Sequence, residues 1–260
     1  MSIITLTSDW GYRDSYLGAV KGAILKQIPG AVIVDVTHEV TKYNFRQAAF
    51  IIRNFYNDFP EGTIHLIGVM TEESDEYPHI VARYKNQYFI GADTGVFALI
   101  FDEAPEEIIL LDIHLDTNYL TFSTRDRFVK AAAHIAAGKP LSGLGYPREA
   151  LTHRMTLQPT VDGNSIRGNV IYVDSYGNAI TNINESLFRE IGQKRKFLLS
   201  FRGHRPELIR ESRSYGDMPE GEIVVLFGTH GFLEVAVNLG KAKDLLGLDL
   251  DAIVVITFND

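Results

Sequence analysis

The chain has 260 residues and a hydrophobic fraction of 45%, which fits one large domain or two ordinary ones and allows a substantial buried core. Its formal net charge of −8 argues against nucleic acid as a partner, because a phosphate backbone needs a dense face of Lys and Arg. The absence of cysteine excludes disulfides, thiol catalysis and Cys-ligated metal sites.

The first 150 residues alternate short β-branched runs with amphipathic stretches. A strand is predicted over Ile3–Thr7, followed by a helix that ends at Pro29-Gly30, and Asn44 is placed to cap a second helix. Further strands are predicted at Ala31–Val36, Thr63–Met70, His79–Tyr84, Gln87–Gly91 and Ile108–Asp112, and a further helix at Arg125–Ala137. This alternation predicts an α/β domain over residues 1–155, with a mostly parallel central sheet and helices on both faces.

The second half of the chain has a different character. Residues 151–165 are polar and turn-prone, and we expect the linker there. One helix is predicted beyond it, at Glu185–Ile191. The predicted strands are Ile166–Val173, Phe197–Phe201, Glu222–Phe227, Phe232–Val237 and Ala252–Phe258. Short strands separated by Gly- or Asn-containing turns predict a smaller all-β, barrel-like domain over residues 165–260.

The turn after the first predicted strand carries two carboxylates, Asp9 and Asp14. Ligands of open α/β sheets bind beyond the carboxyl ends of the strands, and one carboxylate can accept both hydroxyls of a ribose. Asp9 and Asp14 therefore fit a nucleoside site. The spacing leaves open a second interpretation, in which Asp14 caps the following helix and Asp9 shapes the turn. No GxGxxG or Walker pattern indicates phosphate binding.

Two polar clusters lie in the C-terminal half. The segment Asp174–Asn182 combines Tyr176, whose ring can stack on a base, with Asn178, whose amide can read a base edge; a Tyr-Gly-Asn hairpin turn is the alternative. Glu234 interrupts an apolar run, and a carboxylate in such surroundings needs a cationic partner. That partner is a ligand ammonium or an Arg of this chain, unless Glu234 faces solvent on an alternating strand.

Several common signatures are missing from the sequence. The eight histidines show no metal-ligand spacing, and no GxSxG nucleophile elbow is present. No run of about 18 apolar residues exists, so no membrane span is expected. The N-terminus lacks the basic region and apolar core of a signal peptide, and we expect a cytoplasmic protein.

Motifs in a distinctive order extend over nearly the whole chain. The pattern Thr-x-Asp-x-Gly-x-x-Asp-x-Tyr runs from Thr7 to Tyr16 and is followed by Lys21-Gly22. The order continues at residues 34–39, 59–63, 91–95, 121–126, 174–182 and 231–236. Together these motifs resemble the S-adenosylmethionine (SAM) hydroxide adenosyltransferase, chlorinase and fluorinase family.

The resemblance implies an α/β domain, a β-barrel domain and a homotrimer that binds SAM between subunits, with SAM as substrate and no separate cofactor or metal. A nucleophile attacks ribose C5′ and displaces methionine; water or hydroxide yields adenosine, and a halide yields a halogenated nucleoside. Carried over by motif position, the substrate-binding residues are Asp9, Asp14, Tyr16, Phe122, Thr124, Asp174, Tyr176, Asn178, Tyr215 and Glu234. Among them, Glu234 would take the methionine ammonium, and Thr124 matches a halide-binding Ser of the halogenases.

The chain departs from this family at the positions that orient and activate water in the hydrolases. Met70 stands where the family has Asp, Tyr77 or Pro78 where it has Arg, and Ser123 where it has His. The catalytic residues are therefore not identified by the resemblance.

Three functions follow from these observations. The first is a SAM hydrolase with a substituted water-activating set, for which the acidic run Glu72, Glu73, Asp75 and Glu76 offers a base. The second is a protein that binds SAM or adenosine without turnover, and the third is an enzyme acting on another adenosyl substrate. A halogenase is disfavoured, because Met70 stands at the position of its active-site Tyr, and His230 and Val237 stand where it has arginines.

Overall fold

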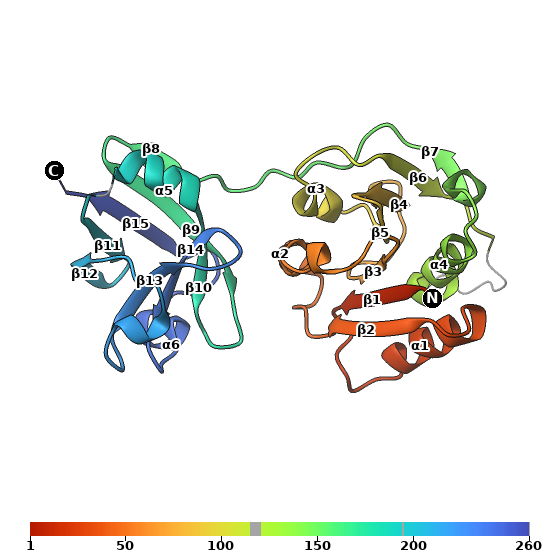
Figure 1. Cartoon of the computed structure of the whole chain (residues 1–260), viewed down its shortest axis with the longest axis horizontal. Helices are drawn as coiled ribbons and strands as arrows, with labels where there is room; N and C mark the ends of the chain where they lie inside the picture. Colours follow the sequence, from red (N-terminus) through yellow and green to blue (C-terminus); the bar gives the residue numbers. More distant parts are fainter. Residues whose placement is uncertain (115–120, 194, 260) are drawn as a thin grey trace. The chain divides into compact units, whose positions relative to one another are not determined.

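The computed structural model describes residues 1–114, 121–193 and 195–259. The chain divides into two compact units, Met1–Arg154 and Met155–Asp260. The N-terminal unit contains the elements from β1 to β7, and the C-terminal unit contains those from β8 to β15 (Figure 1).

One sheet organises the N-terminal unit, in the order β2-β1-β3-β5-β4-β6-β7. Its strands are β1 (Ile3–Ser8), β2 (Val32–Thr37), β3 (Ile64–Gly68), β4 (His79–Tyr84), β5 (Gln87–Ala92), β6 (Glu107–Leu111) and β7 (Gly145–Pro147). The β1–β2, β1–β3 and β3–β5 pairings are parallel, whereas β4 pairs antiparallel with β5 and β6, as does β6 with β7. The sheet is therefore mixed, and the prediction of a mostly parallel sheet is not confirmed.

The antiparallel half of this sheet begins at the β4–β5 hairpin. Tyr84 pairs with Gln87, so only Lys85 and Asn86 form the connection, with φ of 49° and 56°. Two central residues with positive φ form the turn that matches the twist of paired strands. A parallel pairing needs a crossover of a dozen or more residues, so this short connection requires an antiparallel pair.

Helices cover both faces of the sheet (Figure 1). α1 (Tyr16–Gln27) and α4 (Val129–Ala136) share one core cluster with β1 and β3, while α2 (Phe45–Arg53) and α3 (Val96–Ile100) share another with β4 and β5. Asn44 caps α2 as predicted, accepting a hydrogen bond from the Gln47 amide at 3.0 Å. α3 was not predicted, because five residues are too few to show a helical period.

The predicted helix at Arg125–Ala137 consists of two segments. It begins as a π-helix, η2 (Thr124–Phe128), in which the Val129 amide bonds to the Thr124 carbonyl, and continues as α4. A π turn carries one extra residue, which changes the direction of the side chains beside it, and such turns are frequent at functional sites.

The C-terminal unit is a barrel-like antiparallel sheet in the order β12-β11-β15-β9-β10-β14-β13, with β8 beside β9. Its strands are β8 (Thr160–Asp162), β9 (Ser165–Val173), β10 (Ala179–Asn184), β11 (Phe197–Phe201), β12 (His204–Ile209), β13 (Ile223–Phe227), β14 (Phe232–Val237) and β15 (Ile253–Phe258). β8 lies in the range expected to be linker, and β10 and β12 were not predicted. Phe188 of α5 (Glu185–Gly192) packs into the core beside Phe197 and Phe258.

The helices of both units are short. α1 has 12 residues, which corresponds to about 18 Å at 1.5 Å per residue. Across the described ranges, no helix combines the length and the apolar character needed to cross a bilayer.

Candidate functional site

Asp9 lies directly after β1, at the carboxyl edge of the N-terminal sheet, and its side chain is almost fully buried. Its Oδ2 accepts a hydrogen bond from the Tyr43 amide at 2.9 Å, and its main-chain carbonyl accepts one from Lys42 Nζ. A carboxylate offers about four acceptor positions, so this bond fixes Asp9 without using its full capacity. Asp9 therefore combines the turn-shaping role with acceptor capacity for a ligand.

Three aromatic side chains, Trp10, Tyr16 and Phe122, form an aromatic cluster beside Asp9. The ring centroid of Phe122 lies 5.3 Å from that of Tyr16 and 5.9 Å from that of Trp10, both at 84°. Tyr16 is about half exposed. The structure thus brings together the predicted residues Tyr16 and Phe122, and adds Trp10, whose occurrence as the chain's single Trp in a turn was the available signal.

The end of β3 is shaped to receive Trp10. A Cβ atom added to Gly68 would lie 2.5 Å from Trp10 Cζ2, closer than real Cβ atoms approach other atoms. Gly68 therefore provides the space in which the indole lies.

Asp14 is exposed in the turn before α1. The N-cap residue of α1 is Ser15, which makes no side-chain capping bond. The interpretation of Asp14 as a helix cap is therefore wrong, and its role in ligand binding stays a prediction.

A set of polar side chains, from buried Ser8 and His38 to the partly exposed Asp35 and Lys21, lies next to the turn. Ser8 Oγ lies 2.7 Å from His38 Nδ1, and His38 Nε2 lies 3.1 Å from Asp35 Oδ1, while Asp35 Oδ2 pairs with Lys21. Burial opposes ionisation of Asp35, but the bonds from Lys21 and His38 outweigh it and lower the pKa of Asp35. Trp10 stacks on His38. The scattered histidines gave no sequence signal for this network.

The three substituted positions carry no charge where the resemblance expects one. Met70 follows β3 with a φ of +49° and packs beside Val69, and Ser123 is buried at the start of η2. Tyr77 lies under the guanidinium of Arg154, 5.4 Å from the ring centroid.

A different charged cluster, formed by Glu73, His79 and Arg127, lies at the same edge of the sheet. Arg127 pairs with Glu73 Oε1, and His79 Nδ1 lies 3.3 Å from Arg127 Nη1 and 3.9 Å from Glu73 Oε1. His79 Nε2 lies 3.0 Å from the Thr71 carbonyl. Burial lowers the pKa of His79, and Glu73 opposes that shift. Only Glu73 was named from the sequence, because His79 and Arg127 are 48 residues apart and show no motif.

Two buried side chains at this edge keep unused hydrogen-bonding capacity. Thr124 is fully buried, and Asp93, which follows β5, is also fully buried. Asp93 Oδ2 accepts from the Thr152 amide and pairs with Arg148, but Asp93 Oδ1 and Thr124 Oγ1 have no partner among the described residues. Buried polar atoms are rarely left unpaired, so a water or a ligand is the expected partner of both atoms.

In the C-terminal unit, Asp174 closes the turn between β9 and β10. Its Oδ1 accepts from the Tyr176 and Asn178 amides at 2.9 and 2.8 Å, and its Oδ2 accepts from Asn178 Nδ2 at 3.0 Å. This is the hairpin that the sequence offered as the alternative to a binding cluster. It leaves the Tyr176 ring three-quarters exposed and available for stacking.

Glu234 is buried on β14 rather than facing solvent, and its partners among the described side chains are a Tyr and a His. Glu234 Oε1 accepts from the Tyr215 hydroxyl at 2.8 Å, and Oε2 lies 3.3 Å from His230 Nε2. Burial and the bond to Glu234 raise the pKa of Tyr215. The structure therefore joins the predicted residues Tyr215 and Glu234, and adds His230, which the sequence showed only at the position of a halogenase arginine.

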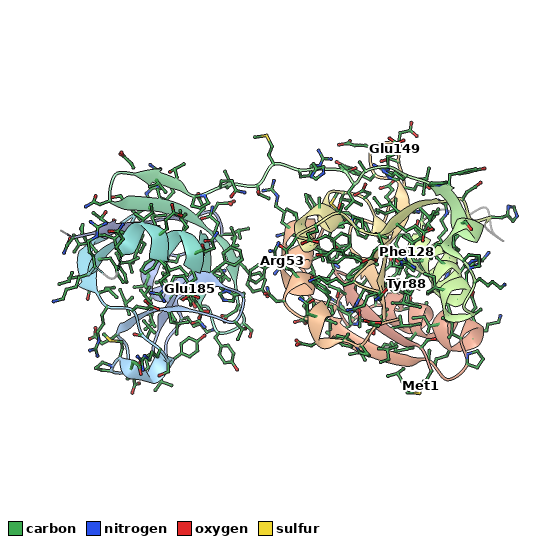
Figure 2. All side chains as sticks on the ribbon, turned by 45° about the horizontal axis from the view of Figure 1, so that its top comes forward. Met1, Arg53, Tyr88, Phe128, Glu149 and Glu185 are labelled. Atoms are coloured by element: carbon green, nitrogen blue, oxygen red, sulfur yellow. The ribbon has the colours of Figure 1, made fainter. Side chains whose placement is uncertain are left out.

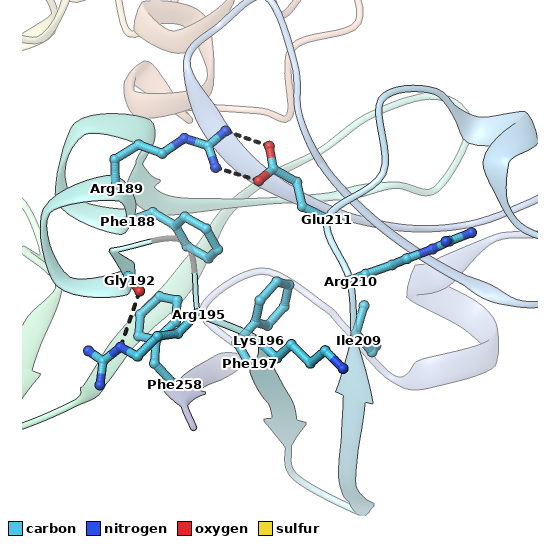
Figure 3. A pocket seen from close by; sticks show the side chains of 10 residues that line it. All are labelled: Phe188, Arg189, Gly192, Arg195, Lys196, Phe197, Ile209, Arg210, Glu211 and Phe258. Atoms are coloured by element: carbon cyan, nitrogen blue, oxygen red, sulfur yellow. Dashed lines mark hydrogen bonds and ion pairs between the residues drawn. The ribbon is translucent and has the colours of Figure 1, made fainter. Parts of the chain in front are cut away.

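A pocket of about 320 Å³ also opens in the C-terminal unit, with Phe188, Phe197 and Phe258 in its wall (Figure 3). None of the predicted site residues lines it. Arg189 is held there by Glu211 and Glu185, and Arg195 donates to the carbonyls of Ile191 and Gly192. These arginines are thus held by the protein itself, and the pocket is not assigned to the substrate.

Two family models match the chain. The N-terminal domain of SAM hydroxide adenosyltransferases matches residues 4–145, and the C-terminal domain matches residues 168–255. The chain belongs to the SAM hydroxide adenosyltransferase family. The family predicted from the order of the motifs is confirmed.

Similar proteins cover the chain nearly end to end. A Thermus thermophilus protein named (R)-S-adenosyl-L-methionine hydrolase is 31% identical, over 95% of this chain and 96% of that protein. A protein of the same name from Methanocaldococcus jannaschii is 28% identical, over 98% and 96%. The crystal structure of an uncharacterized conserved protein from Thermotoga maritima has a TM-score of 0.88 and 30% identity, over 99% of this chain and 100% of that one. This member of the family therefore shares its two-unit architecture with a solved structure.

Proposed function

We propose that this protein is a SAM hydrolase that cleaves SAM to adenosine and methionine. The relatives that carry this name align with both units of the chain. The observation that carries the proposal is the arrangement of buried Asp9 beside the aromatic cluster at the carboxyl edge of the sheet. An acceptor for ribose hydroxyls next to aromatic rings suits an adenosyl group.

The proposed reaction is an in-line displacement at ribose C5′. A water oxygen bonds to C5′ while the C5′–S bond breaks, and its electron pair goes to the sulfur of methionine. One water proton is released, so that SAM and water give adenosine, methionine and a proton. Aligning the two reactants in a dry site supplies about 7–11 kcal/mol at best. The chain's own residues must then orient the water and accept its proton.

The remaining predicted residues receive roles in the same proposal. Glu234 would attract the methionine ammonium, because a buried carboxylate favours a cationic neighbour. Tyr176 would stack on the adenine from its exposed turn. The residues proposed to complete the contacts are Asp14, Thr124, Asp174, Asn178 and Tyr215.

We further propose a cytoplasmic homotrimer in which the N-terminal unit of one subunit and the C-terminal unit of the next share one SAM molecule. The resemblance supports this arrangement. Light scattering after size-exclusion chromatography tests it, and a monomeric mass would contradict it.

The reaction is tested by incubating the pure protein with SAM and measuring adenosine and methionine by liquid chromatography. We expect equal amounts of both products, formed well above the uncatalysed background. Background rates together with saturable SAM binding in calorimetry would establish the second candidate, a binding protein without turnover. That candidate is favoured by the uncharged side chains at Met70, Tyr77 and Ser123.

A further inference from the structure

The charged cluster is assembled from three elements that meet at the carboxyl edge of the N-terminal sheet. Glu73 lies in the loop after β3, and Arg127 lies in η2. His79 opens β4 and pairs with Ala92, the last residue of β5. The same edge carries Asp9 after β1, which pairs in parallel with β3. The cluster therefore lies on the side of the sheet where the proposed substrate site begins.

The segment that carries Arg127 also carries part of the aromatic cluster. The Asp126 amide donates to the Phe122 carbonyl at 3.1 Å, so Phe122 starts the helical segment in which Arg127 follows. Between them lies Thr124, whose buried hydroxyl has no partner in the described parts of the chain. Phe122 of the aromatic cluster, the unpaired hydroxyl of Thr124 and Arg127 of the charged cluster thus lie within one short segment.

Within the cluster, His79 fixes Arg127. Because His79 Nε2 donates to the Thr71 carbonyl, Nδ1 is the acceptor for Arg127 Nη1 at 3.3 Å. His79 is fully buried, its ring meets Phe128 edge-on, and Phe128 itself lies in the interior of the N-terminal unit (Figure 2). The charged groups that face His79 are Glu73 and Arg127. A neutral imidazole in this position holds the guanidinium without adding charge.

Arg127 in turn fixes Glu73. Both cluster contacts of Glu73 use Oε1, and no described residue bonds to Oε2. The Glu73 side chain is 42% exposed, whereas that of Arg127 is 15% exposed. The carboxylate is thus held through Oε1 on a side chain that is partly exposed to solvent.

We propose that Glu73 binds the attacking water through Oε2 and accepts its proton, and that Arg127 and His79 are positioning residues for this carboxylate. This inference rests on the proposed SAM hydrolysis. As the water oxygen bonds to C5′ and the C5′–S electron pair leaves with methionine, the water proton passes to Glu73 and then to solvent. The negative charge of the carboxylate is also opposite to the positive charge of the sulfonium in the substrate.

The decisive variant is Glu73→Gln, which keeps the shape of the side chain and removes its basicity. We expect kcat to fall about 100-fold or more, as is typical for loss of a general base. KM for SAM, SAM binding in calorimetry and the unfolding temperature should stay near wild-type values. Glu103→Gln, at an exposed position of the same unit outside the acidic run, is the matched control and should keep wild-type kcat.

A second variant tests the inference independently, in case Glu73→Gln fails to fold. Arg127→Lys keeps the positive charge but loses the planar fork that contacts both Glu73 and His79. We expect kcat to fall about tenfold with unchanged KM. If the wild type forms adenosine and both variants do so at its kcat, the inference is overturned while the hydrolase function stands. If the wild type forms none, the proposed function fails first.

Discussion

The two sides of the candidate site in the N-terminal unit are built in different ways. On the proposed binding side, Asp9, Trp10 and Tyr16 lie within eight residues of one another, although the Tyr43 amide that holds Asp9 is 34 positions away. On the proposed reacting side, Glu73 and Arg127 are brought together from distant positions by the sheet and η2. The proposed binding residues therefore occur together as a short sequence motif. The proposed reacting residues are brought together by long-range contacts, which other residues of the fold can also make.

The comparison predicts the largest loss of binding at Asp9. Asp9→Ala removes the acceptor proposed for the ribose hydroxyls, and hydrogen bonds to a charged group contribute about 1.5–3 kcal/mol each. We expect SAM affinity in titration calorimetry to fall about 100-fold. Asp58→Ala, on the exposed surface of the same unit, serves as control. Unchanged affinity in Asp9→Ala would remove Asp9 from the binding side.

A smaller effect is expected at Gly68, which supports the binding side without touching the ligand. Gly68→Ala places a Cβ against Trp10 and must displace the indole. We expect SAM affinity to fall about tenfold, which corresponds to about 1.4 kcal/mol. Gly22→Ala, in α1 with no atom within 4 Å of the added Cβ, should retain affinity. Equal affinities for the two variants would show that the indole position does not matter.

The smallest effect is expected at Met70, where the resemblance places an Asp. The φ of +49° suits Asp better than most side chains, so Met70→Asp is tolerated by the backbone. If Glu73 already accepts the proton, kcat should change by less than about twofold. A general base contributes about 10²–10⁴-fold to the rate, so the supply of a missing base would give a far larger change. A large gain in adenosine formation would show instead that the reacting side of the natural protein is incomplete.

Local patterns predicted most of the elements and part of the site. Strands β4, β11 and β14 and the capping of α2 by Asn44 follow from side-chain periodicity and capping chemistry within a few residues. The mixed sheet was not predicted, although the two-residue connection at Lys85-Asn86 indicates an antiparallel pair of strands. The π turn of η2 was missed because five residues are too few to show a change in the helical period.

The partners of charged residues were harder to predict than the residues themselves. Glu234 was identified as a carboxylate that needs a partner, yet only the fold shows that Tyr215 and His230 supply it. The same holds for Glu73, which the sequence shows as one of four acids in a loop. Ion pairs form between residues that the order of the strands in the sheet brings together. That order produces no repeating pattern in the sequence.

By itself, the sequence determined the family and the α/β and all-β character of the two halves, and it predicts the binding side around Asp9, because each depends on residues close together in the chain. The tertiary structure decided the direction of the strands, the aromatic cluster and the charged cluster. These depend on contacts over tens of residues, such as the 48 between His79 and Arg127. Burial then decides their chemistry, since it removes water from His79 and leaves Glu73 as the group that faces solvent.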